Sequence, residues 1–484
     1  MQQERRIRLL QADELRFDRR IGHDVKRVIG NVIFEHEGTR MYCDSAWHYE
    51  ATNSIEAFSR VRIVSEDTLF LYGDYMKYDG NTRIAEVHGN VRLIDGETEL
   101  TTTELFYDRN TGISYYLRGG QIVDGENVLT SQSGHFMSRE DRAHFRNNVV
   151  LTNPEYTMHS DTLVYDTRTR IAYFFGPTEI RAEDSFIYCE NGWYDTQNDV
   201  SRFSRGAFVI NREHILRGDS LHYDRLNEIG MAWNNVMIDD TVQEITFTGQ
   251  FAEYFGTEGY TFITEQALAI FAEQGDSLFL HADTLFAFFD NTQEIQTVRG
   301  SNNARFFRDD FQGASDSLVY HNADSMIWMY DQPILWTGRN QFTADTIAVR
   351  TNGRQVEWMN LAGDAFIVNQ DDSVRFNQIK GRIMQGNFVE GRLNNILVTG
   401  NSETVYYVRE EDGDLTGVNS AIASRMRIEI IDDQVHRIFY FEKPEATFFP
   451  EHELPENLRR LPGFNWFYVL RPQKWSDVFV KVPQ

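Results

Sequence analysis

The feature that most constrains this 484-residue chain is a repeat with a period of about 28 to 33 residues. One unit, Leu71 to Ile94, predicts a strand with Met76 and Tyr78 on one face, then a polar turn, then a second strand interrupted by Gly89. The tyrosine position recurs, with substitutions, at Phe17, Tyr49, Tyr78, Tyr107, Met137, Tyr165, Tyr194, Tyr223, Tyr254, Ala287, Tyr320 and Val349. A fixed period of this size is typical of stacked arrays, in which no unit buries its apolar face without neighbours.

A second register keeps the same period. Small or turn-forming residues interrupt the second strand of successive units, at Gly30-Asn31, Gly89-Asn90, Gly119-Gly120, Asn147-Asn148, Gly176-Pro177 and Asn234-Asn235. Such residues inside a strand mark a bulge or a bend. A bend at the same place in every unit would fold the whole sheet along one line.

The turns indicate how neighbouring strands run. The first strand of a unit often ends in Tyr-Asp followed by polar residues, as at Tyr78-Asp79 and Tyr107-Asp108, and such residues reverse the chain in hairpins. The sequence therefore predicts an all-β fold, an elongated repeat β-jellyroll of stacked antiparallel strands, V-shaped in section, with two facing sheets. A stacked parallel β-helix is the alternative.

Three regions follow from the regularity of the repeat. Residues 1-240 are expected to form regular N-terminal β-jellyroll repeats, and residues 241-441 looser repeats that continue the same array. Residues 442-484 hold six of the nine prolines together with Trp466 and Trp475. Because proline does not sit inside central strands, the ladder is expected to stop near Phe441, and the tail to be a cap or a docking segment.

The charge balance excludes two classes of partner. The formal net charge is −26, whereas a nucleic-acid surface needs clustered Lys and Arg. The same charge argues against simple electrostatic adhesion to an anionic membrane. An anionic lipid would have to be held mainly by its apolar part.

Cysteine content and segment hydropathy add little. Cys43 and Cys189 lie about five units apart, too far for a disulfide within one chain. No run of about 18 apolar residues is present. Residues 1–6 lack the apolar core of a signal peptide, so the chain is either cytosolic or a mature form whose signal was removed.

The residues that could carry chemistry favour no enzyme. Catalysis needs one asymmetric cluster of groups in unlike environments, but the acids recur at equivalent turns, and no H-E-x-x-H, G-x-S-x-G or P-loop motif is present. Four acid pairs are expected to be solvated turns: Asp239-Asp240, Asp309-Asp310, Asp371-Asp372 and Asp432-Asp433. No catalytic residue, metal ligand or cofactor is predicted.

The distinctive remaining feature is a ladder of large apolar groups. A sheet creased along one edge leaves the opposite edge open, so these groups would line an apolar trough suited to acyl chains, at about 0.8 kcal/mol for each buried CH₂. Filling of the space between the sheets is the structural alternative for the same residues. The candidates are Trp47, Tyr49, Met76, Tyr78, Leu105, Tyr107, Leu163, Tyr165, Leu221 and Tyr223.

Several of these motifs together resemble the OstA-like proteins, relatives of the periplasmic bridge component of lipopolysaccharide transport. The runs that carry the resemblance are Val28 to Phe34, Cys43 to Tyr49, Leu71 to Asp74 with Lys77 to Gly80, Ser160 to Leu163 with Phe175 to Thr178, and, in the tail, Lys443 to Ala446 with Arg471-Pro472. The resemblance covers roughly residues 10 to 400.

The resemblance implies a non-enzymatic protein of outer-membrane biogenesis. It implies a β-jellyroll in the periplasm of a Gram-negative envelope, with a removed signal peptide, and leaves open whether the protein associates with the outer membrane. The implied ligand is lipopolysaccharide, bound by its lipid A acyl chains on the way from the inner to the outer membrane. The implied partners are other β-jellyroll components of the transport machinery, which would join by edge-strand pairing.

Docking and function leave specific alternatives. The strand around Val28 to Phe34 is expected to be one docking edge, with the Pro-rich tail covering the other. A structural or glycan-binding β-solenoid of the cell envelope is the alternative function, and it should present aromatic and polar platforms on its outer surface. A polysaccharide-degrading β-helix should show one unrepeated cluster of acid and base, and none is found.

Overall fold

The computed structural model consists almost entirely of antiparallel strands, which confirms the predicted fold class and excludes the parallel β-helix. The residues described are 6–17, 25–65, 69–137, 139–211, 214–273, 276–352, 355–410, 412–431 and 434–480. They divide into two compact units. Unit 1 takes in the described residues up to 211 together with 219–226, and unit 2 takes in 214–218 and 227–480.

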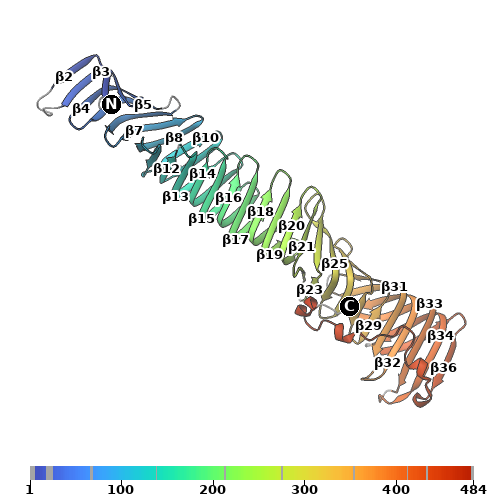
Figure 1. Cartoon of the computed structure of the whole chain (residues 1–484). Coiled ribbons are helices and arrows are strands. Elements are labelled where there is room, and N and C mark those ends of the chain that lie inside the picture. Colours follow the sequence, from blue (N-terminus) through green and yellow to red (C-terminus); the bar gives the residue numbers. More distant parts are fainter. Residues whose placement is uncertain are drawn as a thin grey trace. The chain divides into compact units, whose positions relative to one another are not determined.

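Unit 1 is built from antiparallel strands, and most of the long ones pair with the next strand along the chain (Figure 1). They are β1 (Arg8–Gln11), β2 (Glu14–Phe17), β3 (Val25–His36), β4 (Thr39–Tyr49), β5 (Ser54–Ser65), β6 (Leu69–Asp79), β7 (Ile84–Asp95), β8 (Thr98–Asp108), β9 (Ile113–Tyr116), β10 (Gly120–Asp124), β11 (Asn127–Ser131), β12 (Ser133–Met137), β13 (Arg142–Thr152), β14 (Tyr156–Asp166), β15 (Ile171–Ala182), β16 (Ser185–Asp195) and β17 (Val200–Asn211). Strand β18 (His214–Asp224) is divided between the two units.

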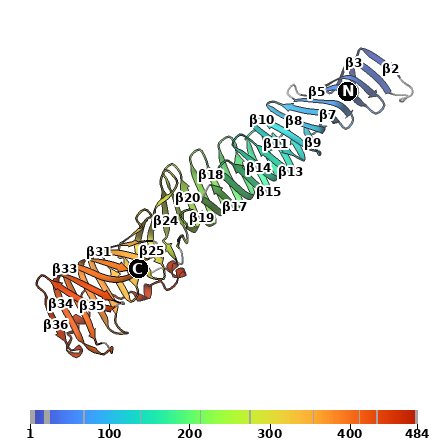
Figure 2. The same cartoon turned by 180° about the vertical axis from the view of Figure 1, so that it is seen from behind.

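Unit 2 continues the same kind of strand and ends in four short helical turns (Figure 2). The strands are β19 (Ile229–Asp240), β20 (Ile245–Phe255), β21 (Tyr260–Thr264), β22 (Leu268–Glu273), β23 (Asp276–His281), β24 (Thr284–Phe289), β25 (Ile295–Phe307), β26 (Phe311–His321), β27 (Met326–Tyr330), β28 (Ile334–Thr337), β29 (Asn340–Thr343), β30 (Thr346–Thr351), β31 (Val356–Gln370), β32 (Phe376–Val389), β33 (Arg392–Arg409), β34 (Leu415–Ile431), β35 (Gln434–Phe441) and β36 (Glu445–Phe449). The helical turns are η1 (Glu451–Glu453), α1 (Glu456–Arg459), η2 (Tyr468–Leu470) and η3 (Trp475–Phe479).

Aspartates close the hairpins at one side of the ladder. The Asp79 carboxylate accepts hydrogen bonds from the backbone N–H groups of Asn81 (2.8 Å) and Thr82 (3.1 Å), and Asp108 accepts one from the N–H of Asn110 (2.8 Å). The same turn chemistry occurs at Asp166 and Asp195. The Tyr-Asp signal therefore marks hairpins because the carboxylate satisfies the donors that the turn leaves unpaired.

A second recurring device bends alternate strands. Two consecutive residues with positive φ interrupt the ladder at Gly30-Asn31, Ser59-Arg60, Gly89-Asn90, Asn147-Asn148 and Arg205-Gly206 in unit 1, and in unit 2 at Asn234-Asn235, Glu265-Gln266, Asn302-Asn303, Asp331-Gln332, Gly363-Asp364, Gly400-Asn401 and Glu442-Lys443. The register of pairing shifts at the same places, for example between His88 and Val91. We call this line of bends the crease. The predicted bends at Gly30, Gly89, Asn147 and Asn234 are confirmed.

The adjacent strand supplies a carboxylate to many of these bends. Asn31 Nδ2 donates to Asp13 at 2.9 Å, Asn90 Nδ2 donates to Asp74 at 2.7 Å, and Asn303 Nδ2 donates to Asp283 at 2.8 Å. At Ser59-Arg60, where neither residue favours positive φ, the Arg60 guanidinium donates instead to Asp44, at 2.7 Å from Nη2. A side chain from the neighbouring strand therefore stabilises backbone geometry that costs about 1–2 kcal/mol for each non-glycine residue.

The crease divides each unit into two halves that face each other. In unit 1, the half that ends at the Tyr-Asp turns is called the tyrosine half, and the other is called the aliphatic half. The segment of β7 before Gly89 pairs with the end of β8 in the tyrosine half, and the segment after Gly89 pairs with the start of β8 in the aliphatic half. This arrangement is the predicted V of two sheets with a shared edge.

The end of unit 2 corrects the expectation that the ladder stops near Phe441. Strand β36 pairs with β34, from Ala421 opposite Ala446 to Val418 opposite Phe449. The proline that suggested an end, Pro444, follows the positive-φ residues Glu442 and Lys443 and so stands at a crease, where no ladder hydrogen bond is lost.

The start of unit 1 corrects the predicted docking edge. The segment Val28 to Phe34 lies in β3, which pairs with β4 on one side and with β1 and β2 on the other. The outermost strands are therefore β1 and β2, which flank a bend at Asp13. Both strands are short and exposed, as natural edge strands often are.

The crease yields a stability prediction. A Cβ at Gly89 (φ +71°) would lie 2.6 Å from Asp74 Oδ2, whereas a Cβ at Gly96 (φ +60°) would meet nothing within 4 Å. We expect Gly96→Ala to cost about 1–2 kcal/mol from backbone strain alone, and Gly89→Ala about 1–3 kcal/mol more from crowding. Urea unfolding midpoints of both variants measure the difference, and equal losses would contradict a packed crease.

Candidate functional site

The interior of the tyrosine half alternates large and small side chains from strand to strand. Successive partners across the ladder are His48, Ile55, Tyr78, Ala85, Tyr107, Ser114, Phe136, Ala143, Tyr165, Ala172, Tyr194 and Ser201. From Tyr107 onward each ring has a small neighbour on both sides. We call this set the tyrosine row. The alternation gives each ring room to lie inward without crowding the next.

The facing aliphatic half presents an unbroken row of apolar side chains. Its successive ladder partners are Phe34, Met41, Ile63, Leu71, Leu93, Leu100, Ile122, Leu129, Leu151, Met158, Ile180, Ile187 and Val209. We call this set the aliphatic row. Most of its members are nearly or fully buried, for example Leu71 at 0% exposure. The two rows together form one continuous apolar seam inside unit 1.

Most of the predicted trough residues face the interior of unit 1, and three of them, Tyr78, Tyr107 and Tyr165, belong to the tyrosine row. Met76, Tyr78, Leu105, Tyr107, Leu163 and Leu221 are all at most 6% exposed, Tyr165 is half-buried, and Tyr223 is 37% exposed. Met76 shares a face with Leu105 through Val87, and Tyr78 with Tyr107 through Ala85.

Two predicted trough residues lie on the opposite face. Trp47 pairs with Glu56, which pairs with Lys77 on the outer face, whereas the inward neighbour of Tyr78 is Ile55, opposite His48. Tyr49 occupies the last rung before the turn, the position that Asp79 holds in the next sequence repeat. The predicted shared face is therefore wrong for Trp47 and Tyr49, because a shift of one residue moves a strand's side chains to the other face.

The seam opens into a pocket in the middle of unit 1. Its cavity volume is only ≈ 20 Å³, within ≈ 470 Å³ of space between the lining atoms that includes open solvent. Phe136, Ala143 and Tyr165 contribute from the tyrosine row, and Ile122, Leu129 and Leu151 from the aliphatic row. Phe145 and Leu163 also line it, with Asp124, Asn127, Thr167 and Thr196 among its polar members. The pocket is thus apolar in depth, with polar groups from the turns.

Sequence reasoning missed the aliphatic wall of this pocket. The predicted inward residues all belong to the first strand of each repeat, which ends in Tyr-Asp. The second strand is predicted only to contain a bend. The available signal was the period-two apolar pattern in the second halves, as in Val149 and Leu151, or Val91 and Leu93.

Polar contacts bridge the two rims of the seam opposite the crease. The Tyr78 hydroxyl lies 2.7 Å from His36 Nδ1 on the aliphatic half and accepts a hydrogen bond from Arg109 Nη1 at 2.7 Å. Arg83 forms an ion pair with Glu37 at 2.7 Å. Farther along, the Tyr165 hydroxyl donates to Asp124 at 3.3 Å.

Burial keeps these rim tyrosines protonated. It raises the pKa of Tyr78, against the opposing effect of the Arg109 charge. Burial, with the negative charge of Asp124, raises the pKa of Tyr165 to about 12. The phenol groups therefore remain neutral hydrogen-bond donors near pH 7, with rings in the apolar seam and hydroxyls at its rim.

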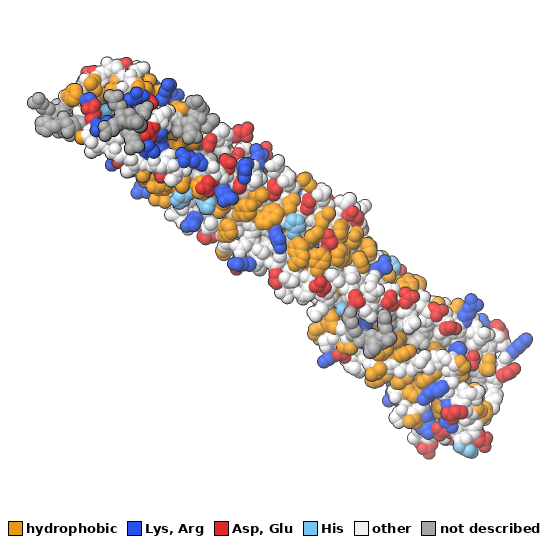
Figure 3. Space-filling view, in the orientation of Figure 1, with side chains coloured by type: hydrophobic (Ala, Val, Ile, Leu, Met, Phe, Trp, Pro, Cys, Tyr) orange, Lys and Arg blue, Asp and Glu red, His pale blue; other side chains and the backbone are white. Residues whose placement is uncertain are grey.

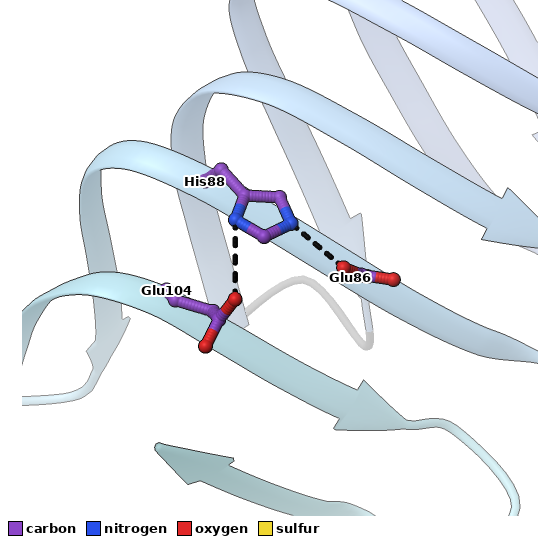
Figure 4. A group of neighbouring side chains, drawn as sticks. All are labelled: Glu86, His88 and Glu104. Atoms are coloured by element: carbon purple, nitrogen blue, oxygen red, sulfur yellow. Dashed lines mark hydrogen bonds and ion pairs between the residues drawn. The ribbon is translucent and has the colours of Figure 1, made fainter. Parts of the chain in front are cut away.

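A histidine lies between two carboxylates on the outer face of unit 1 (Figure 4). His88 Nε2 is 2.8 Å from Glu86, its Nδ1 is 3.5 Å from Glu104, and the three ligand atoms lie within 4.8 Å of one another. Arg118 lies 3.7 Å from Glu104, and the Tyr75 ring contacts the His88 ring. Hydrogen bonds and close contacts among these partly exposed polar groups account for the arrangement.

The predicted acid pairs are mostly turn and ion-pair groups. Asp371 binds Arg409 at 2.6 Å, and Asp372 binds Arg375 at 2.6 Å. Asp240 corrects the expectation of solvated turns, because it is 3% exposed and accepts from the backbone N–H groups of Val242 and Gln243. Asp432 and Asp433 lie outside the described residues.

Both cysteines are buried free thiols. Burial raises the pKa of Cys43 and of Cys189 to about 12, so neither forms a reactive thiolate near neutral pH.

On the visible surface, acidic and basic side chains are interspersed (Figure 3). Within the described residues, no helix has the length and apolar character needed to cross a membrane.

Comparison with known proteins places a family match at the N-terminal end. Residues 4–161 match the model of the OstA-like protein family, which confirms the resemblance for that part of the chain. A solved structure of LptH from Pseudomonas aeruginosa, titled the LptA homologous periplasmic component of the lipopolysaccharide transport device, aligns with 18% identity. The alignment covers 22% of this chain and 81% of that one, at a TM-score of 0.21. A search of curated proteins found no match.

The buried His48 predicts how stability depends on pH. Burial lowers the pKa of His48 in the folded state, so its contribution is complete above the unfolded value of about 6.5 and is lost as the pH falls toward the folded pKa. We expect His48→Gln to flatten the fall in stability between pH 7 and 5 by up to about 1.4 kcal/mol per pH unit. The matched control is His452→Gln, because the His452 side chain is 81% exposed. An unchanged slope in His48→Gln would contradict the assignment.

Proposed function

We propose that this chain, with its OstA-like region at residues 4–161, is a non-enzymatic carrier that binds lipopolysaccharide and transfers it between the two membranes of a Gram-negative envelope. The observation that carries the proposal is the pocket bounded by the tyrosine row on one side and the aliphatic row on the other. The acyl chains lie between the two rows and the polar headgroup lies at the rim.

The shape of the seam suits a ligand with several acyl chains. The rows are continuous, so a chain that enters at the pocket meets apolar neighbours in both directions along the ladder. Each buried CH₂ contributes about 0.8 kcal/mol. Binding therefore needs no catalytic group or metal, and it tolerates differences in acyl length.

The rim suits the anionic headgroup of the same ligand. Arg83, Arg109 and Arg139 come from successive turns beside the seam, in a chain whose net charge is −26. Arg83 donates to Asn110 Oδ1 at 3.1 Å, and Arg139 donates to the Asn110 carbonyl at 2.8 Å, so these guanidinium groups are close to one another. Arginine pairs well with phosphate because its planar donors match two oxygens.

The proposed location is the periplasm, with partners that share the β-jellyroll fold. The outermost strands β1 and β2 leave one backbone edge of unit 1 available for edge-strand pairing, and β35 and β36 do the same for unit 2. These edges replace Val28 to Phe34 as the proposed docking strands.

Photo-crosslinking tests where the ligand lies. A benzophenone side chain in place of Phe136 faces the pocket, whereas one in place of Tyr115, on a neighbouring rung, faces outward. We expect purified lipopolysaccharide to be labelled from position 136 and not from 115, and delipidated saccharide not to compete. Labelling from position 115 alone, or full competition by the saccharide, would overturn the proposal.

Filling the pocket gives a second test with a matched control. Ala143 lines the pocket, whereas Ala323 is exposed in the turn between β26 and β27, away from both rows. We expect Ala143→Leu to weaken binding of lipopolysaccharide on the order of 10-fold, because the added carbons displace about two CH₂ groups of ligand. Ala323→Leu should leave affinity within about 2-fold. Equal affinities of the two variants, measured by titration, would contradict the proposed site, and circular dichroism checks that each variant is folded.

One observation favours the glycan-binding alternative for unit 2. Phe251, Tyr260, Phe262, Phe286 and Phe288 gather on the outer face of β20, β21 and β24, with ring centroids 5.9–6.5 Å apart. Outward aromatic rings are the platform expected of a glycan binder. Binding of the delipidated saccharide that is abolished by Phe288→Ala, with lipid labelling absent at position 136, would establish this function in place of lipid transfer.

A further inference from the structure

The C-terminal segment 450–480 lies along the outer face of unit 2 and runs back toward the earlier strands (Figure 1). We call it the strap. It contains η1, α1, η2 and η3 but no strand, and its contacts pass from β34 near its start to β23 and β25 near its end. The Pro-rich tail, which the sequence predicts as the cover of the second docking edge, therefore lies on a face of the sheet instead.

Three separate apolar anchors hold the strap. Leu454 and Leu461 pack with Phe366, Val368, Phe376, Val405, Tyr407 and Val418. Phe467 and Leu470 pack against Ala314, Ile334 and Trp336, and Val478 packs against Leu268 and Phe307. Other side chains of the strap are exposed: Val469, within the second anchor, at 91%, and Trp475, between the second and third anchors, at 49%. The strap is thus a bound peptide in character, rather than a second sheet layer.

Two buried glutamines bind the main chain of the strap. Gln378, 0% exposed, donates to the Arg459 carbonyl at 2.9 Å and accepts from the Leu461 N–H at 2.8 Å. Gln341, 1% exposed, donates to the Asn465 carbonyl at 2.8 Å and accepts from the Phe467 N–H at 2.7 Å. In both cases the side-chain amide forms one hydrogen bond with the C=O of a strap residue and another with the N–H of the residue two positions later.

Further polar groups on the same face complete the contact. Gln312, 3% exposed, accepts from Arg471 Nε at 2.8 Å. Arg305, 5% exposed, donates to the carbonyls of Leu470 and Val480. A polar side chain buried on an outer sheet face costs stability unless a partner covers it. These four residues are therefore explained by an extended peptide that lies over them.

We propose that this face of unit 2 is a groove that binds an extended apolar peptide through its main chain, occupied in cis by the strap and able to accept the same segment from a second copy of the chain. The glutamine contacts select an extended backbone, and the three anchors select apolar residues at the spacing of Leu454, Leu461, Phe467 and Val478. Exchange of identical segments between copies needs no new contacts.

Cleavage of the full-length protein tests the proposal. A protease site inserted between Phe449 and Pro450 allows the strap to be cut while it remains bound. We expect the cut strap to stay with unit 2 in size-exclusion chromatography. A fluorescent peptide of residues 450–480 should then replace it saturably, and should bind uncut protein far more weakly because the attached strap competes at an effective concentration of about millimolar.

Variants separate main-chain recognition from simple apolar contact. We expect Gln341→Ala and Gln378→Ala each to weaken binding of the labelled peptide by about 10-fold, since each removes two hydrogen bonds. The matched control is Gln385→Ala on β32, where Gln385 is exposed, and it should leave binding unchanged.

Two outcomes overturn the proposal. A cut strap that never exchanges with the labelled peptide would make residues 450–480 a fixed part of the unit 2 core. Equal peptide affinity in the Gln341→Ala, Gln378→Ala and Gln385→Ala proteins would show that the glutamines do not read the main chain. Circular dichroism of each variant confirms that any loss of binding is not a loss of fold.

Discussion

The structure of each unit depends on one constraint, the bend at the crease. A flat antiparallel ladder of this composition would expose its apolar face, because hairpins alone only add strands side by side. Two residues of positive φ in alternate strands turn the ladder onto itself and bring the two halves face to face. Carboxylates such as Asp74 hold the bend from the adjacent strand, so each unit of the repeat helps to shape its neighbour.

The crease also determines what the interior can hold. Long strands such as β7 and β13 cross from one half to the other, and short strands such as β9 and β10 each lie in one half, so the ladder adds side chains to both the tyrosine row and the aliphatic row. The rows run along the ladder instead of closing around a centre, and the seam is therefore continuous. At the rim, neutral tyrosine hydroxyls and arginines meet the solvent. An amphiphilic molecule matches this order of apolar depth and polar rim.

Unit 2 uses the same ladder with an added surface. In β31 the four consecutive residues Ala365 to Val368 are all buried, although alternate residues of a strand face opposite sides of the sheet. The inner side packs in the core and the outer side packs under the strap. Buried glutamines and apolar groups on an outer face are stable only where a peptide covers them. The outer face of unit 1 around His88 differs, because its side chains are partly exposed.

Period-two alternation and turn chemistry are local properties, so the sequence predicts the repeat, the hairpins, the antiparallel fold and several inward residues of the tyrosine half, but not those of the aliphatic half. Glycine and asparagine predict the bends at Gly30, Gly89, Asn147 and Asn234, whereas Ser59-Arg60 and Glu442-Lys443 carry no such signal, and side chains from other strands or the surrounding ladder impose the conformation there. The face on which Trp47 and Tyr49 lie depends on how their strand pairs, since a shift of one residue in register inverts a strand. Likewise, the pairing of β3 on both sides and the path of the strap depend on contacts between residues far apart in the chain, such as Gln341 with Asn465, and no local pattern encodes such contacts.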